Sequence, residues 1–359
     1  MMKKLQYAAV AGAVMAALAG PASAQSNLTL YGTVDMGLVR ESGGIAGVTR
    51  LTSGVASGSR LGFKGREDLG GGMAVVFLLE NGFQADTGAL GQGGLLFGRQ
   101  AYAGLQTQAG TVTLGRQYTP QYLAIAAVDP FNSGTAGDSK NLMMATGNAA
   151  SRMDNSVKYS SPVMQGFNAE LVAGAGEVAG DSGAGRQLGG ALAYAGGPWA
   201  LRLAYHHRDN DTAALRNAGS ARNTVATAMY DAGSFKAHFA YGVDQGLNSA
   251  LARNLNNPFG AAVAPVASTD SNVVLVGLSV PQGAGTWLVS YIRKNDKTAY
   301  NQDAQQVAAG YRHALSKRTD LYGVLASIRN RNGAGYTVGS AIEGGSGNRA
   351  INLGVRHSF

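Results

Sequence analysis

Apolar and polar residues alternate at single-residue spacing along most of this chain. From position 28 the apolar residues fall on one parity: Leu28, Leu30, Val34, Met36 and Leu38. The polar residues fall on the other: Thr29, Tyr31, Thr33 and Asp35. Because successive side chains of a strand point to opposite faces, the pattern predicts a β-strand with one apolar and one wet face.

The chain ends in the same pattern, INLGVRHSF. Ile351, Leu353, Val355 and Phe359 share one face, whereas Asn352 and Arg356 share the other. The last residue therefore stands at full strand register, and a strand that ends there needs a partner. We expect it to pair with the first strand, near residues 28–38, which would close the sheet.

Two classes of connector separate the alternating segments. Seven are short, and the first six of them contain Gly or Pro, as tight hairpins favour: EDLGGG, TQAG, SPVMQG, AGGP, DAGS, PQGAG and LSKRTD. Eight are long and polar, at about 41–57, 84–95, 118–151, 176–185, 208–221, 244–270, 295–303 and 331–347. Together they join sixteen strands, which predicts an all-β fold: a closed 16-stranded antiparallel transmembrane β-barrel with short periplasmic turns and long outer loops.

The first 24 residues have the features of a cleaved signal peptide. Lys3 and Lys4 precede an apolar stretch from about Ala8 to Ala19, and the small residues Ala22-Ser23-Ala24 follow. The apolar stretch is too short for a permanent membrane helix, which needs about 20 residues. We expect residues 1–24 to be removed and residues 25–359 to form one barrel domain in the outer membrane.

Composition is consistent with an exported barrel. There are 53 Gly, only 8 Pro and no Cys, so backbone pairing rather than disulfides must hold the chain together. The formal charge is +8, and loss of Lys3 and Lys4 leaves +6. For an exported protein this excess favours small anions or lipid phosphates as partners and makes nucleic acid the least favoured.

Five segments resemble the general porins of Gram-negative bacteria, in particular those of β-proteobacteria: LTLYGTVDMGL, SRLGFKGREDLGGGMAVVFLLENGF, FGRQAYAGLQTQAGTVTLGRQYTPQY, MDNSVKYSSPVMQGF and the terminal LGVRHSF. The resemblance implies a homotrimer of 16-stranded barrels in contact with outer-membrane lipid and lipopolysaccharide. It also implies a third loop folded into the pore, and a terminal Phe359 that the barrel-assembly machinery recognises. The implied function is passive diffusion of small hydrophilic solutes and ions, with no cofactor and no enzyme activity.

The third loop runs from about Tyr118 to Ser151. A loop of this length is uncommon unless it is functional or disordered, and the alternative to a pore loop is a mobile surface loop. Its middle, residues 123–128, is apolar and could form a short helix or pack inward. Asp129 and Asp138 are the candidate acidic residues of the constriction.

The resemblance places Arg60 and Arg99 on the wall opposite this loop, with Arg152 as a third basic member. Lys64 shares the face of Arg60 but lies about 13 Å further along the strand, at about 3.3 Å per residue. Lys158 and Arg116 are weaker candidates, since Arg116 shares parity with apolar Val112 and Leu114 and reaches the lumen only if the strand bends. A basic excess at the constriction would favour anions.

Hairpin register suggests a role for Glu80. If Arg66 faces Met73, then Arg60 lies across from Leu79 or Glu80; if Phe83 meets Leu96, then Glu80 lies across from Arg99. We therefore expect Glu80 to stand between two arginines, align them and reduce the local positive charge.

Two other classes of function compete with a pore. An enzyme would need a nucleophile and base together. His206 and His207 are neighbours on a strand and point to opposite faces, and His357 lies on the outward face near the terminus. His238 and His313 lie among strand residues without a close acidic or serine signature. Asp209 and Asp211 could hold Ca²⁺ loosely, which is a weak signal. An adhesin or structural barrel would not need a long third loop with an apolar middle and acidic ends.

Overall fold

The structure is a computed structural model that describes residues 27–143, 151–250 and 256–359. The expected signal peptide lies outside these residues, as do positions 144–150 of the third loop. No helix in the described ranges has the length and apolar character needed to cross a membrane.

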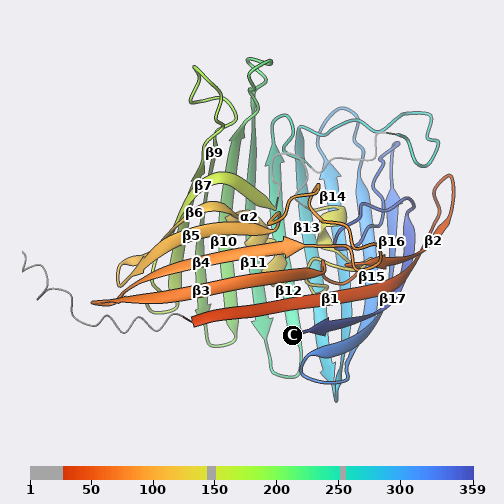
Figure 1. The fold of residues 1–359 in the computed structure, drawn as a ribbon. Coiled ribbons are helices and arrows are strands. Elements are labelled where there is room, and N and C mark those ends of the chain that lie inside the picture. The colour runs from red at the N-terminus through yellow and green to blue at the C-terminus, as the bar shows by residue number, and fades with distance from the viewer. Residues whose placement is uncertain (1–26, 144–150, 251–255) are drawn as a thin grey trace, which may run out of the picture.

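Seventeen strand segments form a single antiparallel sheet (Figure 1). Their bounds are β1 Asn27–Ser42, β2 Val48–Ser53, β3 Arg60–Gly70, β4 Met73–Gly82, β5 Gln100–Thr107, β6 Gly110–Tyr118, β7 Arg152–Ser160, β8 Phe167–Gly174, β9 Gln187–Gly196, β10 Trp199–Asp209, β11 Ser220–Asp231, β12 Lys236–Gln245, β13 Asp270–Gln282, β14 Gly285–Asp296, β15 Ala304–Ala314, β16 Thr319–Asn330 and β17 Arg349–Ser358. There are sixteen positions around the barrel, because β2 and β3 occupy one position together. β2 pairs with residues 36–41 of β1, and β3 pairs with residues 27–33 of the same strand.

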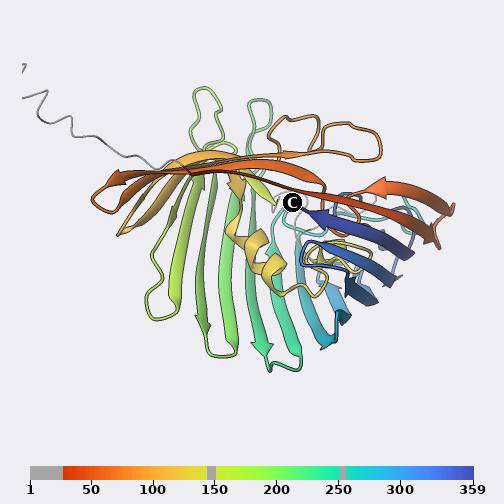
Figure 2. The same cartoon turned by 60° about the horizontal axis from the view of Figure 1, so that its bottom comes forward.

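The first and last strands meet, as the terminal alternation predicted. β1 and β17 pair from Thr33 opposite Ser358 to Ser42 opposite Arg349. The backbone N–H and C=O of Phe359 both bond to Gly32, each at 3.1 Å. The sheet is therefore a closed 16-stranded antiparallel barrel, and the C-terminus lies beside β1 (Figure 2).

Side-chain parity separates the two faces of the wall. Leu28, Leu30 and Leu38 of β1 are exposed on the outside, whereas Thr33 and Asp35 are buried on the inside. The terminal strand repeats this, with Ile351 and Leu353 exposed and Asn352 buried. An apolar exterior is what a lipid environment requires of a barrel wall.

The seven short turns fall where the sequence predicted them, whereas the expected first long loop is different. Residues 41–57 contain the end of β1, a turn at residues 43–47 and the whole of β2. Thr49 and Leu51 continue the outward alternation of a strand, and the real interruption is the short segment 54–59 between β2 and β3.

The third loop folds into the barrel. It contains helix α2 (Pro120–Val128) and the 3-10 turn η1 (Ser139–Asn141). Thr119 caps α2, since its hydroxyl accepts the Tyr122 N–H at 3.2 Å, and Pro120 suits the first helical position. Figure 2 shows α2 inside the ring of strands.

Apolar side chains of the loop bury themselves against the inner wall. Ala124, Ile125 and Val128 of α2 join one buried cluster with Ala204, Val225, Ala240 and Leu275 of β10–β13. The interior of this side of the barrel is therefore packed, and the open passage lies toward the opposite wall.

Candidate pore constriction

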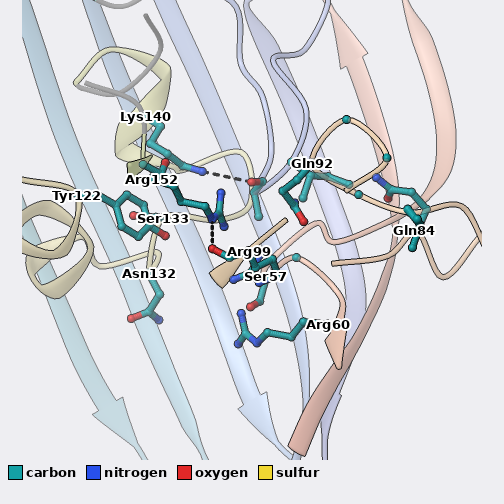
Figure 3. Close-up of a pocket in the computed structure, with 18 of the residues that line it drawn as sticks. Ser57, Arg60, Gln84, Gln92, Arg99, Tyr122, Asn132, Ser133, Lys140 and Arg152 are labelled. Carbon is teal, nitrogen blue, oxygen red and sulfur yellow. Dashed lines mark hydrogen bonds between the residues drawn. The ribbon is translucent and has the colours of Figure 1, made fainter. Parts of the chain in front are cut away.

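A cavity of about 660 Å³ lies between the third loop and the opposite barrel wall. Five cationic side chains line it: Arg60, Arg99, Lys140, Arg152 and Arg356. No carboxylate is among its lining residues in the described part of the chain. Figure 3 shows Lys140 and Tyr122 from the third loop, Arg152 beside them at the start of β7, and Arg60 and Arg99 from the start of β3 and the residue before β5.

Arg99 is the most buried of the three predicted arginines, and its hydrogen bonds link residues of neighbouring strands. It lies just before β5 and donates to Glu80 through Nε at 2.8 Å and to the Tyr118 hydroxyl at 2.8 Å. Arg152 donates to the same hydroxyl at 3.0 Å and to the Arg99 carbonyl at 2.7 Å. Its guanidinium also lies over the Tyr118 ring, 4.7 Å from the centroid, so Tyr118 joins the two arginines.

Glu80 stands between two arginines, although the expected register is wrong. Its carboxylate lies 2.8 Å from Arg99 Nε and 3.9 Å from Arg60 Nε, and it also accepts the Tyr31 hydroxyl at 2.8 Å. Across the strands, however, Glu80 faces Gly62 and Gln100.

The register error comes from the turn. Arg66 pairs with Val76 rather than Met73, because β3 continues to Gly70 and an irregularity lies between Asp68 and Gly70. The long arginine side chains reach Glu80 from neighbouring positions.

The two acidic residues expected on the loop side do not face the passage. Asp129 is 2% exposed and Asp138 is fully buried. Asp129 accepts backbone N–H groups of Phe131, Ser133 and Ser139 at 2.8–3.1 Å, so it fixes the turn after α2. Asp138 caps η1 and lies 3.1 Å from Lys140 Nζ. The prediction that these carboxylates form the acidic side of the constriction is wrong, because the backbone of the loop itself uses them.

Burial also alters the protonation of these loop groups. Desolvation raises the pKa of Asp129 to about 6, and the neighbouring Asp138 carboxylate acts in the same direction. Desolvation likewise raises the pKa of Asp138, against the opposing effect of Lys140.

The sequence interpretation missed two cations of the cavity. Lys140 is the single basic residue between Tyr118 and Arg152, so its position in the loop was a usable signal. Arg356 lies on the inward parity of β17, and Asp320 accepts two hydrogen bonds from it at 2.7 and 3.1 Å. The loop side of the cavity thus carries a positive group where negative ones were expected.

The other three basic candidates, Lys64, Lys158 and Arg116, do not line this cavity. Lys64 lies near the Tyr31 ring, 5.4 Å from its centroid, and is further along β3, as its spacing predicted. Lys158 lies mid-strand on β7. Arg116 pairs with Asp154 and donates to the Gly98 carbonyl at 2.8 Å. The irregularity between Gly115 and Gln117 in the β6–β7 pairing does not bring Arg116 into the cavity.

Hydrogen bonds hold the third loop across the lumen. The Ala136 N–H donates to the Asn352 side chain on β17, and Asn141 donates to Gln306 on β15 at 2.9 Å. Lys140 Nζ donates to the Ala341 carbonyl of the last long loop at 3.2 Å. The loop is therefore fixed at several points, and the position of Lys140 is set by the surrounding backbone.

Asp209 and Asp211 form no cation site in the structure. They accept backbone N–H groups of Asp211 and Ala218, at 2.9 and 2.8 Å. Among the described residues, no group of three His, Asp or Glu side chains is placed to hold a metal ion.

Comparison with known proteins identifies the family. Residues 9–333 match the family model described as Gram-negative porin. The chain belongs to the Gram-negative porin family. It is 30% identical over its full length to an outer membrane porin protein of Bordetella pertussis, covering all of both chains. It is also 30% identical to outer membrane porin protein 32 of Delftia acidovorans, covering 98% of this porin and 99% of that protein.

Solved structures agree with this assignment. The anion-selective porin from Comamonas acidovorans superimposes with a TM-score of 0.73 at 26% identity, covering 93% of this porin and 100% of that chain. OmpT of Vibrio cholerae shares the fold, with a TM-score of 0.64 at 15% identity, covering 94% and 99% of the two chains. The porin is an outer-membrane protein of a Gram-negative bacterium, and its relatives are channel proteins rather than enzymes.

Proposed function

We propose that this porin forms a water-filled channel for passive diffusion of small hydrophilic solutes and ions, and that the channel prefers anions. The observation that carries the proposal is the cavity lined by five cations and no carboxylate in the described chain. Three carboxylates form ion pairs with these cations: Glu80, Asp138 and Asp320. Among these cations and the carboxylates that pair with them, five positive and three negative groups leave an excess of two positive charges.

The mechanism requires no bond chemistry. Fixed guanidinium groups raise the local concentration of small anions and lower that of cations. Arg60, Lys140 and Arg356 keep side-chain exposures of 27%, 23% and 22%, so they can contact a passing solute. Arg99 is only 10% exposed and acts by positioning Glu80 and Tyr118. Because arginine does not deprotonate at relevant pH, the field persists over the working range.

The comparison with solved porins supports this preference and an oligomeric form. One structural neighbour is named an anion-selective porin, and another is named a trimer form. We propose that this porin is a homotrimer. We further propose that Phe359, which closes the barrel against Gly32, is also the residue that the assembly machinery recognises.

A planar bilayer under a KCl gradient tests the ion preference. The expected result is a measurable conductance and a reversal potential displaced toward the chloride equilibrium potential. Substituting Arg60→Gln together with Lys140→Gln should move that potential toward zero. The matched control is Arg216→Gln, which removes an exposed arginine that pairs with Asp181 in an outer loop. A cation-selective wild-type channel would overturn the proposal while leaving the fold intact.

A further inference from the structure

Uncharged hydrogen-bonding side chains line the same cavity as the five cations. Gln84 and Gln92 come from the long loop between β4 and β5, and Asn132 and Ser133 come from the third loop. In Figure 3 the two glutamines lie on one side of Arg99, and Asn132 and Ser133 lie on the other. The cations are therefore flanked on both sides by groups that can bond to a neutral part of a solute.

Two of these side chains hold hydrogen-bonding capacity that the protein does not use. Ser133 is 5% exposed, yet its Oγ has no hydrogen-bond partner among the described residues. The amide oxygen of Gln92 is also buried and has no partner in the described part of the chain. Because buried polar atoms in folded proteins are nearly always bonded, both atoms are suited to bond with water or with a solute in the cavity.

The backbone at these positions is held in an uncommon conformation. Gln92, Asn132 and Ser133 have φ angles of 48°, 54° and 54°, in the left-handed region that few residues other than glycine adopt. In the third loop the Asp129 carboxylate holds this turn by accepting the Ser133 N–H at 3.1 Å. Beside Gln92, Gly82 leaves room for the amide, since a Cβ there would lie 2.0 Å from the amide oxygen. Such conformations persist only where the surrounding structure fixes them, and they are concentrated at functional sites.

The two kinds of lining group recognise different parts of a solute. A carboxylate accepts charge-assisted hydrogen bonds from arginine and lysine, and Arg60 and Lys140 offer partly exposed cations from β3 and from the third loop. Amides and hydroxyls both donate and accept, so they pair with the hydroxyls of a sugar. The cavity volume of about 660 Å³ falls within the range of about 300–1,000 Å³ that small-molecule sites have. A solute that carries both a carboxylate and several hydroxyls would use the whole lining.

We propose that this cavity binds sugar acids, which are small carboxylates with several hydroxyl groups, more tightly than carboxylates without hydroxyls. The carboxylate contacts an exposed cation, Arg60 or Lys140, and the hydroxyls replace water at Gln92 on one side or at Asn132 and Ser133 on the other. Binding of this kind is weak, because a permeating solute must leave the site as well as enter it. The proposal rests on the anion preference proposed above and adds the class of solute.

Block of the chloride current in a planar bilayer tests the site on the whole porin. Glucuronate is titrated in KCl at neutral pH, and the fall in current gives its half-blocking concentration. The matched probe is tetrahydropyran-2-carboxylate, which has the same ring and carboxylate but no hydroxyls. The ratio of the two half-blocking concentrations is taken within each variant, so that differences in the number of open channels cancel.

In the wild type, glucuronate should block at a concentration at least about fivefold lower than the matched probe, since one net hydrogen bond changes affinity by about that factor. Gln92→Met with Ser133→Ala keeps the size and the charges and should bring the two acids within twofold. The control pair, Gln108→Met with Ser182→Ala, changes an exposed glutamine of a short turn and an exposed serine of an outer loop, and should keep the wild-type ratio. Lys140→Gln should weaken block by both acids alike, because they share the carboxylate.

A wild-type ratio within twofold would overturn the sugar-acid site, as would an unchanged ratio in the double variant or an equal loss of the ratio in the control pair. If the double variant opens no channels, Ser133→Ala alone takes its place and should lower the ratio at least about twofold. A cation-selective wild-type channel would overturn the channel proposal and the sugar-acid site together. An anion-selective channel that does not distinguish the two acids would overturn the sugar-acid site alone.

Discussion

Replacing Glu80 by Gln should increase the anion preference of the channel. Glu80 is the carboxylate next to Arg60 and Arg99, and its loss raises the positive excess at the constriction from two charges to three. The side chain keeps its shape and can still accept a hydrogen bond from Arg99 or Tyr31. The change is therefore mainly electrostatic.

The size of the effect follows from the distances. An anion in contact with Arg60 would lie about 6.5 Å from the Glu80 carboxylate, given the 3.9 Å separation of that pair and an ionic contact of about 2.8 Å. Repulsion at this distance is about 0.6 kcal/mol in bulk water and about 2.5 kcal/mol at an effective dielectric constant of about 20. Bulk water weakens the repulsion most, so the lower figure sets a minimum, and we expect the chloride-to-potassium permeability ratio to rise at least about threefold.

The measurement is the reversal potential at about 0.1 M ionic strength, where the Debye length is about 10 Å and the field is not screened away. Glu67→Gln is the matched control, since Glu67 is an exposed carboxylate further along β3 that forms no ion pair with a described residue. Glu80→Gln with normal conductance and an unchanged ratio would refute the reasoning. A lower ratio would show that ordering of the arginines by Glu80 outweighs its charge.

Three further predictions concern the third loop. Lys140→Gln alone should lower the chloride-to-potassium permeability ratio by about two- to threefold, by the same Coulomb estimate. Arg116→Gln, which lies outside the cavity, should leave that ratio unchanged in the same bilayer assay. Equal effects of the two substitutions would contradict the assigned positions. Because folding raises the pKa of Asp129 from 3.8 to about 6, the closed loop should be most stable below about pH 4, lose stability as pH rises to about 6, and then stay level. Hydrogen exchange of residues 131–142, corrected for intrinsic rates, measures the stability of the loop at each pH. Asp129→Asn should remove most of the dependence of this stability on pH. An increase in protection as the pH rises would contradict the prediction. Gly134→Ala should displace the loop and alter single-channel conductance, because a Cβ there would lie 1.9 Å from the Ala56 carbonyl oxygen; unaltered conductance would mean that the loop absorbs the change elsewhere.

The barrel could be predicted from the sequence because the membrane imposes a rule at every second position. A side chain such as Leu30 or Leu353 must face lipid, and its neighbours must then face the lumen. The same rule placed Glu80 and Arg356 on the inner face. Strand count followed from turn chemistry, and closure followed from the alternation that continues to Phe359.

The residues that line the cavity were only partly predictable, because the alternation of side chains along a strand gives no information on how a loop folds. Asp129 and Asp138 looked like free carboxylates, yet a loop buried in the barrel must satisfy its own N–H groups, and these two acids do so. Hairpin register depended on an irregularity near Gly70 that the run of glycines did not reveal. Lys140 needed a loop conformation before its side chain could be assigned to the cavity.

The break between β2 and β3 has a consequence for how the channel can change over evolution. The carbonyl of Val55 in this break accepts the N–H of Thr135 from the third loop at 2.6 Å and that of Ala341 from the last outer loop at 3.2 Å. The last long loop, much of which is buried, is thereby joined to the third loop through one carbonyl oxygen. An insertion near Ala341 would therefore act on the third loop through this shared carbonyl, so sequence change in the last long loop is coupled to the width of the passage.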